Sequence, residues 1–350
     1  MPQSLFEISK NLLMQDIETI YTLIKQSSQK DARIFIMSVL PYLTACVAGT
    51  IDFMEEHQVD CSALTIKRNY PHVLTKTRNK IKIYRERTNK NMTEIDTIRD
   101  GQNEEFANML RFPILKQLGL NYDLGTYRLG GQIIGNTFLY KWFFDEIEKI
   151  QTENPQLEYG KTLGEAVAFT RKIWHTNYSI KGDFDFGTIE HTDYNITLRA
   201  SKVFASSLDK GQCLFLFNIM CQVNFALYYM DRILSAENSL SIRIKYLTYY
   251  FSCSSIRALE NYCSQNRTAK FPLDSSTMKN ISCLLNEDFC NCMRHYEIRD
   301  RNILGATITH NDEMGALIAF YHGCSKTEFI DKLNDHLEAI SNHIKKSIMA

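Results

Sequence analysis

The sequence predicts an all-α, multi-helical protein. Its 350 residues include only 15 Gly and 6 Pro, and 44% of them are hydrophobic. Few helix-breaking residues among many apolar ones favour long, packed helices. A chain of this length can bury a substantial core in one or two domains.

The N-terminal residues predict a helical hairpin. Residues 4–25 carry apolar side chains at helical spacing, and Ser4 with Glu7 three residues later is typical of a capping box. Residues 31–57 predict a second helix. Pro41 interrupts it and should kink it, because proline lacks a backbone donor and crowds the preceding turn.

Residues 67–90 are strongly basic, with Glu86 as the single acid and a local charge of +8. Between residues 76 and 82 the basic residues alternate, so an extended segment would place them on one side. We expect either a surface that follows RNA phosphates or a solvated face balanced by the acidic residues at positions 94–105. The candidate RNA-binding residues are Arg78, Lys80, Lys82, Arg85 and Arg87.

The middle third predicts two helices, over residues 137–151 and 163–176, followed by a polar stretch at 181–197. The Gly-containing segment that precedes them matches neither a phosphate-binding loop nor a dinucleotide fingerprint. No cofactor is therefore predicted.

After residue 198 the pattern predicts a four-helix unit. Its helices cover residues 212–234, 239–261, 277–296 and 326–348, with a longer loop and a short helix between the last two. We place a domain boundary near residue 200, which separates a helical region, 1–200, from a bundle, 201–350.

The apolar run at residues 213–229 is at the short limit for a membrane span, and Asn218, Gln222 and Asn224 interrupt it. It predicts the central helix of a bundle, with amides that need partners. The chain has 40 basic and 40 acidic residues, and its ten Cys lie mostly in apolar stretches. Without a recognisable signal peptide, these features predict a cytoplasmic protein that does not associate with membranes.

The segment from Phe289 to Tyr296 contains the candidate catalytic residues. On a helix, Asn291 and His295 lie one turn apart on the same face. The string Cys290-Asn291-Cys292-Met293-Arg294-His295 resembles the Arg-polar-x3-His motif of the HEPN superfamily (higher eukaryote and prokaryote nucleotide-binding domain), with Cys290 in the Arg position.

The resemblance implies a C-terminal HEPN-like bundle that forms a homodimer and is related to metal-independent endoribonucleases of toxin or phage-defence systems. It implies that His295 transfers protons during attack of an RNA 2′-hydroxyl, that Asn291 orients it, and that an Arg stabilises the phosphorane. Possible partners are RNA and a protein such as an antitoxin.

Cys290 departs from this pattern, because a thiol has neither the charge nor the planar donor fork of Arg. Three explanations stay open: a degenerate member with weak or no activity, replacement by Arg294, or an inactivating substitution. A second string, residues 299–307, resembles the related Arg-Asn-x-x-Gly-Ala-His form, with Thr307 in the His position.

Other readings of the same residues remain. Cys283, Cys290, Cys292 and His295 are close in sequence, but Cys290 and Cys292 point about 200° apart on a helix, so no metal site is predicted. His295 could also be a histidine that only stabilises a helix end. The alternative function is a non-catalytic helical protein–protein interaction module, which predicts a buried His295 and an apolar surface elsewhere. A third possibility is a small-molecule pocket.

Overall fold

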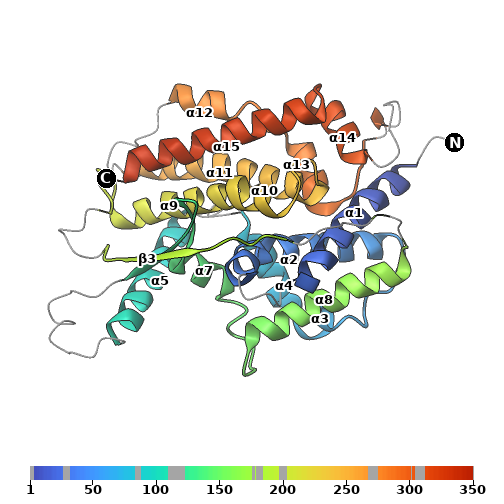
Figure 1. Ribbon diagram of the computed structural model, residues 1–350, viewed down its shortest axis with the longest axis horizontal. Helices are drawn as coiled ribbons and strands as arrows, with labels where there is room; N and C mark the ends of the chain where they lie inside the picture. The colour runs from blue at the N-terminus through green and yellow to red at the C-terminus, as the bar shows by residue number, and fades with distance from the viewer. Residues whose placement is uncertain are drawn as a thin grey trace.

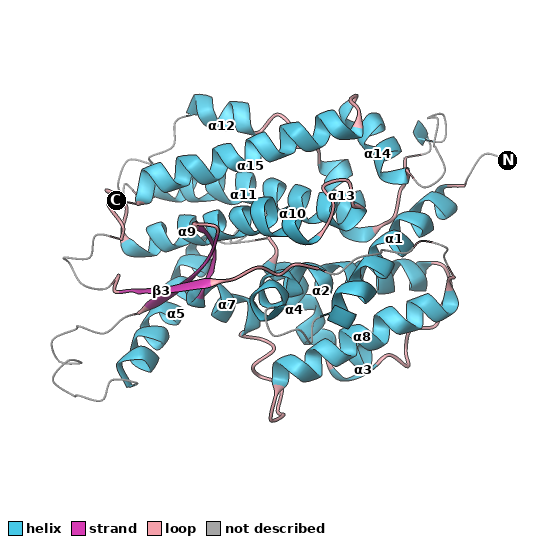
Figure 2. Ribbon diagram, viewed as in Figure 1, coloured by secondary structure: helices cyan, strands magenta, loops and turns pink. Residues whose placement is uncertain are grey.

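The computed structural model confirms an all-α, multi-helical fold with one small sheet (Figure 1). Figure 2 shows how helices dominate the described part of the chain. The structure describes residues 4–26, 32–82, 88–108, 123–175, 178, 184–196, 203–266, 275–300, 302–303 and 312–349.

Helices of the N-terminal half form the lower part of Figure 1. They are α1 (Leu5–Gln26), α2 (Arg33–Glu56), α3 (Thr65–Asn69), α4 (Pro71–Lys80), α5 (Thr88–Asn108), α7 (Thr137–Phe144) and α8 (Pro155–Ile173). The helix predicted at residues 4–25 is confirmed, and the Glu7 N–H donates to Ser4 Oγ at 3.2 Å. Helix α2 continues through Pro41 without the predicted interruption, and the kink expected there stays a prediction.

Helices of the C-terminal half lie above them. They are α9 (Lys210–Asn224), α10 (Met230–Ile233), α11 (Ser239–Gln265), α12 (Ser275–Ile281), α13 (Glu287–His295), α14 (Glu313–His322) and α15 (Lys326–Ile348). A π-helical turn, Phe225–Tyr229, joins α9 to α10, so these three segments together form the helix predicted at residues 212–234. The predicted helices over 239–261 and 326–348 are confirmed as well.

Three segments differ from the predictions. The helix predicted at 277–296 is two helices, because the Asn286 side chain caps a new helix by accepting from the Phe289 N–H at 2.9 Å. Residues 76–80 are helical rather than extended. The helix predicted at 137–151 ends earlier, at Phe144.

A three-stranded antiparallel sheet, which the sequence analysis did not predict, joins the two halves. Its order is β2 (Gln132–Asn136), β1 (Leu124–Leu129) and β3 (Glu190–Tyr194). The turn between β1 and β2 uses Gly130 and Gly131, both with positive φ. This is the requirement of a two-residue type I′ hairpin turn, which glycine meets without strain.

The two halves share a continuous hydrophobic core. α9 packs against α15, α11, α5 and β2, while α1 packs against α11 and α2 packs against α13. The Asn136 amide donates to Asn218 Oδ1 at 2.9 Å, and the Asn224 amide donates to the Ile133 carbonyl at the same distance. Two of the three amides in the apolar run at residues 213–229 therefore have the partners that their burial requires, whereas Gln222 has none among the described residues.

Two segments of the described chain, Arg33–Glu56 and Lys210–Ile233, are long and apolar enough to span a membrane. Their most apolar windows are 83% and 94% buried inside the protein, which is typical of core helices. Length and composition do not distinguish a buried core helix from a membrane span. The absence of membrane association therefore stays a prediction.

Candidate functional site

Helix α13 contains all four residues that the sequence predicted as catalytic. Asn286 caps its first turn, Glu287 and Asp288 lie next to the positive end of the helix dipole, and Tyr296 ends it in the left-handed region with φ of 61°. Phe289 and its neighbours on one face are buried, so the opposite face is directed away from the core.

A buried ion pair fixes the C-terminal end of α13. The guanidinium of Arg243 on α11 donates to the Met293 carbonyl at 2.5 Å and to the Cys292 carbonyl at 3.3 Å. Asp16 on α1 accepts from Arg243 and, at 2.8 Å, from the hydroxyl of Tyr296. These bonds satisfy carbonyls that a helix end leaves without partners.

Gly49 allows α2 to approach this helix end. A Cβ atom at position 49 would lie 2.6 Å from the Arg294 carbonyl oxygen and 3.4 Å from the Tyr296 ring. The first distance is shorter than van der Waals contact allows, so only glycine fits without displacing α13. The close approach places the C-terminal end of α2 beside the polar face of α13.

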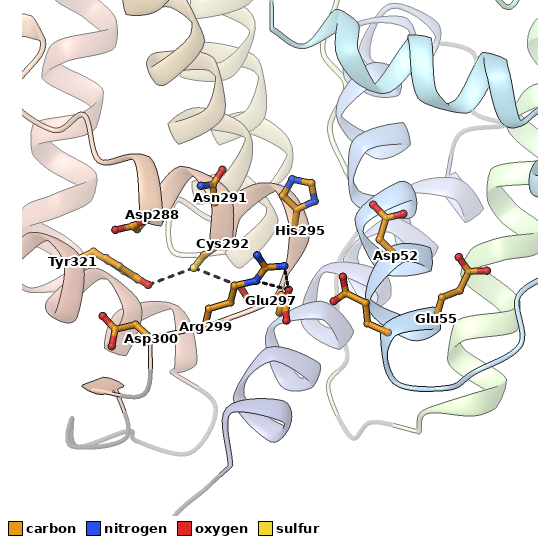
Figure 3. A pocket seen from close by; sticks show the side chains of 11 residues that line it. Asp52, Glu55, Asp288, Asn291, Cys292, His295, Glu297, Arg299, Asp300 and Tyr321 are labelled. Atoms are coloured by element: carbon orange, nitrogen blue, oxygen red, sulfur yellow. Dashed lines mark hydrogen bonds and ion pairs between the residues drawn. The ribbon is translucent and has the colours of Figure 1, made fainter.

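A cavity of about 880 Å³, which we call the acidic cavity, lies between these two helices and α14 (Figure 3). Figure 3 shows side chains from α2 facing those of α13 and the segment after it. The lining residues are Asp52, Glu55, Glu56, Asp288, Asn291, Cys292, His295, Glu297, Arg299, Asp300 and Tyr321.

Of the four residues predicted as catalytic, the structure places Asn291 and His295 in the lining of this cavity. Cys290 is in the hydrophobic core and only 2% exposed, and Arg294 is not part of the lining. The predicted constellation is therefore divided. Position 290 faces away from the cavity, so an Arg at this position would not reach a substrate bound there.

His295 is half-buried, and burial lowers the pKa of its imidazole below the usual 6.5. The positive charges of Arg294 and Arg78 lower this pKa further, against an opposing effect of Asp52. The imidazole is consequently neutral near pH 7. In this form it can accept a proton or a hydrogen bond from a ligand.

Carboxylates dominate the charge of the acidic cavity. Three of the six are in ion pairs: Asp52 with Arg78 at 2.9 Å, Glu55 with Lys67, and Glu297 with Arg299 at 2.5 Å. The other three, Glu56, Asp288 and Asp300, form no ion pair within the described ranges. The cavity therefore retains an excess of negative charge.

Two of the carboxyl groups, those of Glu56 and Glu297, lie so close that a negative charge on one disfavours a negative charge on the other. Burial raises the pKa of Glu56, and the charge of Glu297 and a hydrogen bond to it raise this pKa further. Arg299 opposes the shift. Placing a cation near Glu56 would relieve the repulsion between the two carboxylates.

The basic segment does not form a row of free cations. Lys76 pairs with Glu146 at 2.9 Å, and Lys80 lies 3.1 Å from both Glu94 and Asp145. Arg78, on the same helix, pairs with Asp52. The charges are thus balanced, but of the acidic residues predicted to do so, at positions 94–105, only Glu94 takes part in these pairs.

The other predicted RNA-binding residues, Lys82, Arg85 and Arg87, give no further support for a phosphate-binding surface. The carbonyl of Lys82 accepts a hydrogen bond from Ser255 Oγ at 3.3 Å. Arg85 and Arg87 lie outside the described residues. Thr307, in the second motif-like string, also lies outside them, while Arg299 and Asp300 line the acidic cavity.

Sequence reasoning missed the residues that give this cavity its charge. Asp52, Glu55 and Glu56 are more than two hundred positions from α13, and spacing cannot reveal such a contact. Cys292, also missed, lies 3.6 Å from the Tyr321 hydroxyl. Among the described residues, no three His, Cys, Asp or Glu side chains are arranged to hold a metal ion.

Comparison with known proteins adds no family or relative to this description. No protein-family model matches the chain, and no curated protein and no solved structure shows significant similarity to it.

Proposed function

We propose that this protein is a helical binding module whose acidic cavity accepts a cationic group, such as a guanidinium or ammonium group, from a protein partner. The observation that carries the proposal is the presence of three carboxyl groups, Glu56, Asp288 and Asp300, that form no ion pair in the described structure, in a cavity of about 880 Å³. Charge-assisted hydrogen bonds to such groups are about twice as strong as neutral ones.

Other features of the cavity support a cationic ligand. Asn291 and the neutral His295 can both accept hydrogen bonds, which a guanidinium, with five N–H donors and no acceptor, requires. A phosphate group would instead face the carboxylates, and like-charge contacts disfavour a wrong partner. The cavity thus favours basic peptides over nucleic acids.

Titration calorimetry with a hexa-arginine peptide tests this proposal. The double variant Asp288→Asn and Asp300→Asn should bind the peptide about tenfold more weakly, because two charge contacts are each worth up to about 1 kcal/mol. Asp331→Asn, which removes an exposed carboxylate of α15 outside the cavity, is the matched control. Equal binding by the double variant and the control would contradict the proposal, as would equal affinity for hexa-glutamate.

A second candidate function is a HEPN-like, metal-independent ribonuclease of low activity. Its support is that Asn291 and the neutral His295 line one cavity, with Arg299 nearby as a possible contact for phosphate. His295 would accept the proton of the RNA 2′-hydroxyl, and Asn291 would orient the reacting groups. The surrounding carboxylates weaken this candidate, because they repel phosphate.

Incubation with mixed single-stranded RNA in EDTA tests the ribonuclease candidate. Cleavage by the wild-type protein that His295→Ala abolishes, while Asp331→Asn retains it, would support catalysis. Intact RNA together with hexa-arginine binding would favour the binding module. Binding of neither the peptide nor RNA, by a folded protein, would contradict both functions.

A further inference from the structure

A second cavity, of about 920 Å³, lies between the N-terminal helices, and we call it the apolar groove. It shares no lining residue with the acidic cavity within the described chain. Its walls come from α1, α2, α5, α7 and α8 and from Tyr127 of β1. The apolar lining consists of Ile20, Ile24, Ile36, Met37, Leu40, Leu43, Phe106, Phe144, Leu157 and Leu163, with the rings of Tyr127 and Tyr140.

A buried amide with one unused polar atom lies in the wall of the groove. Gln102 is only 3% exposed, and its Nε2 donates to the hydroxyl of Thr137. Gln102 Oε1 has no hydrogen-bond partner among the described residues. If the O and N atoms of the Gln102 amide were exchanged by a 180° rotation, the Thr137 hydroxyl could donate to Oε1. The NH₂ group would then be the one without a hydrogen-bond partner. In either orientation the side chain offers one unsatisfied polar atom, and a buried polar atom without a partner destabilises the protein.

One basic side chain of the groove is also without a partner. Arg33, at the start of α2, is exposed and forms no ion pair with the rest of the described chain. Lys141 pairs with Glu105 across the groove, and Lys161 lies 3.5 Å from Glu158. Arg33 is therefore available to an anionic group at the rim.

Helix α8 leaves its side of the groove open. A Cβ atom on Gly160 or on Gly164 would have no atom within 4 Å. These two glycines lie one turn apart inside the helix, where glycine is less favourable than alanine. Leu157, one turn earlier, is 55% exposed. The glycines are not required for contacts within the described structure, but they widen the groove.

We propose that the apolar groove binds a small amphipathic molecule with a body of acyl-chain size, an anionic group for Arg33 and a hydroxyl group for the amide of Gln102. The volume and the mainly apolar lining with a few polar groups are typical of small-molecule sites. A hydroxyl can donate to Oε1 or accept from the rotated NH₂, so it satisfies either orientation.

Three probes with the same twelve-carbon body separate the parts of this proposal: dodecanoate, 12-hydroxydodecanoate and dodecyltrimethylammonium. Calorimetry below their micellar concentrations should show tightest binding for 12-hydroxydodecanoate and weakest binding for the cation. Arg33→Gln should weaken dodecanoate binding about two- to fivefold, as expected for an exposed charge contact. Gln102→Leu should remove the advantage of the hydroxylated probe.

Gly160→Leu with Gly164→Leu blocks the groove directly. Lost contact with as few as two methylene groups should weaken binding about tenfold or more. Gly101→Leu is the matched control, because Gly101 is an exposed helical glycine of α5 with no atom within 4 Å and outside the lining. The proposal is overturned if no probe binds below about 1 mM, if the cation binds as tightly as dodecanoate, or if the blocked variant binds like Gly101→Leu. A dimer that the blocking variant disrupts would assign the groove to a second copy instead.

Discussion

Burial determines the protonation of His322, which packs among aromatic rings. Its ring centroid lies 4.8 Å from that of Phe289 and 4.7 Å from that of Phe329. Burial lowers the pKa of this imidazole from 6.5 to about 4, and its Nε2 has no hydrogen-bond partner within the described part of the chain. The native protein therefore holds His322 neutral where the unfolded chain would protonate it.

This shift predicts a loss of stability in mild acid. Between pH 6.5 and pH 4 the unfolded state binds more protons than the native state at this site, so the free energy of unfolding falls as the pH falls. We expect His322 to lower the free energy of unfolding by about 1 kcal/mol between pH 7.5 and pH 5, a value that allows for solvent screening of a partly exposed ring. Urea unfolding of the wild type and of His322→Phe at both pH values checks this. An equal loss in the variant would contradict it.

The burial of Cys290 predicts the effect of restoring the motif arginine. Cys290→Arg should destabilise the protein by about 3 kcal/mol or more, because it places an unpaired charge and a larger side chain in the core. Thermal unfolding measures this, with Asn291→Arg, at an exposed position one residue away, as the control. A stable Cys290→Arg variant with ribonuclease activity would show that this residue reaches the cavity after all.

At the scale of elements, α9 contains a buried amide that costs stability. Gln222 is 2% exposed, and neither polar atom of its side chain has a hydrogen-bond partner. Gln222→Met retains the length of the side chain and removes both atoms, so we expect a gain of about 1–3 kcal/mol in the free energy of unfolding. Chemical denaturation measures the gain. Asn224→Leu, which removes bonds to Ile133 and Ser341, should instead destabilise the protein.

The sequence predicted the helices whose apolar periodicity is long and regular, such as α1, α11 and α15. It failed where side chains distant in sequence determine the backbone. The predicted helix at 277–296 is broken where the hydroxyls of Tyr246 and Tyr249 on α11 bond to backbone groups of residues 281–286. Asn286 then begins a new helix.

The candidate site was also predictable only where it depends on local spacing within one helix. Helical spacing correctly placed Asn291 and His295 on one face, since both line the acidic cavity. It could not identify the carboxylates of α2, because only the packing at Gly49 brings them there. The expected role of the basic segment depended on an extended backbone, whereas residues 76–80 are helical and their charges are paired.

At the scale of the whole molecule, a buried ion pair links the two halves. Asp16 of α1 and Arg243 of α11 are 0% and 1% exposed at their side chains. Asp16→Asn should cost about 3–5 kcal/mol, because it leaves the guanidinium buried without its counter-charge. The loss should affect both halves in a single unfolding transition, followed by circular dichroism and by tryptophan fluorescence. Separate transitions for the two signals would contradict a common core.

Helix α2 forms a wall of both cavities. Its N-terminal half contributes Arg33 and Leu40 to the apolar groove, and its last turns contribute Asp52 and Glu56 to the acidic cavity. Pro41 lies among the groove residues of α2, between Leu40 and Leu43, and has no N–H to donate to the preceding turn, so the helix bends most easily there. A ligand that changed this bend would alter both sites. By thermodynamic linkage, each ligand would then change the affinity for the other by the same factor.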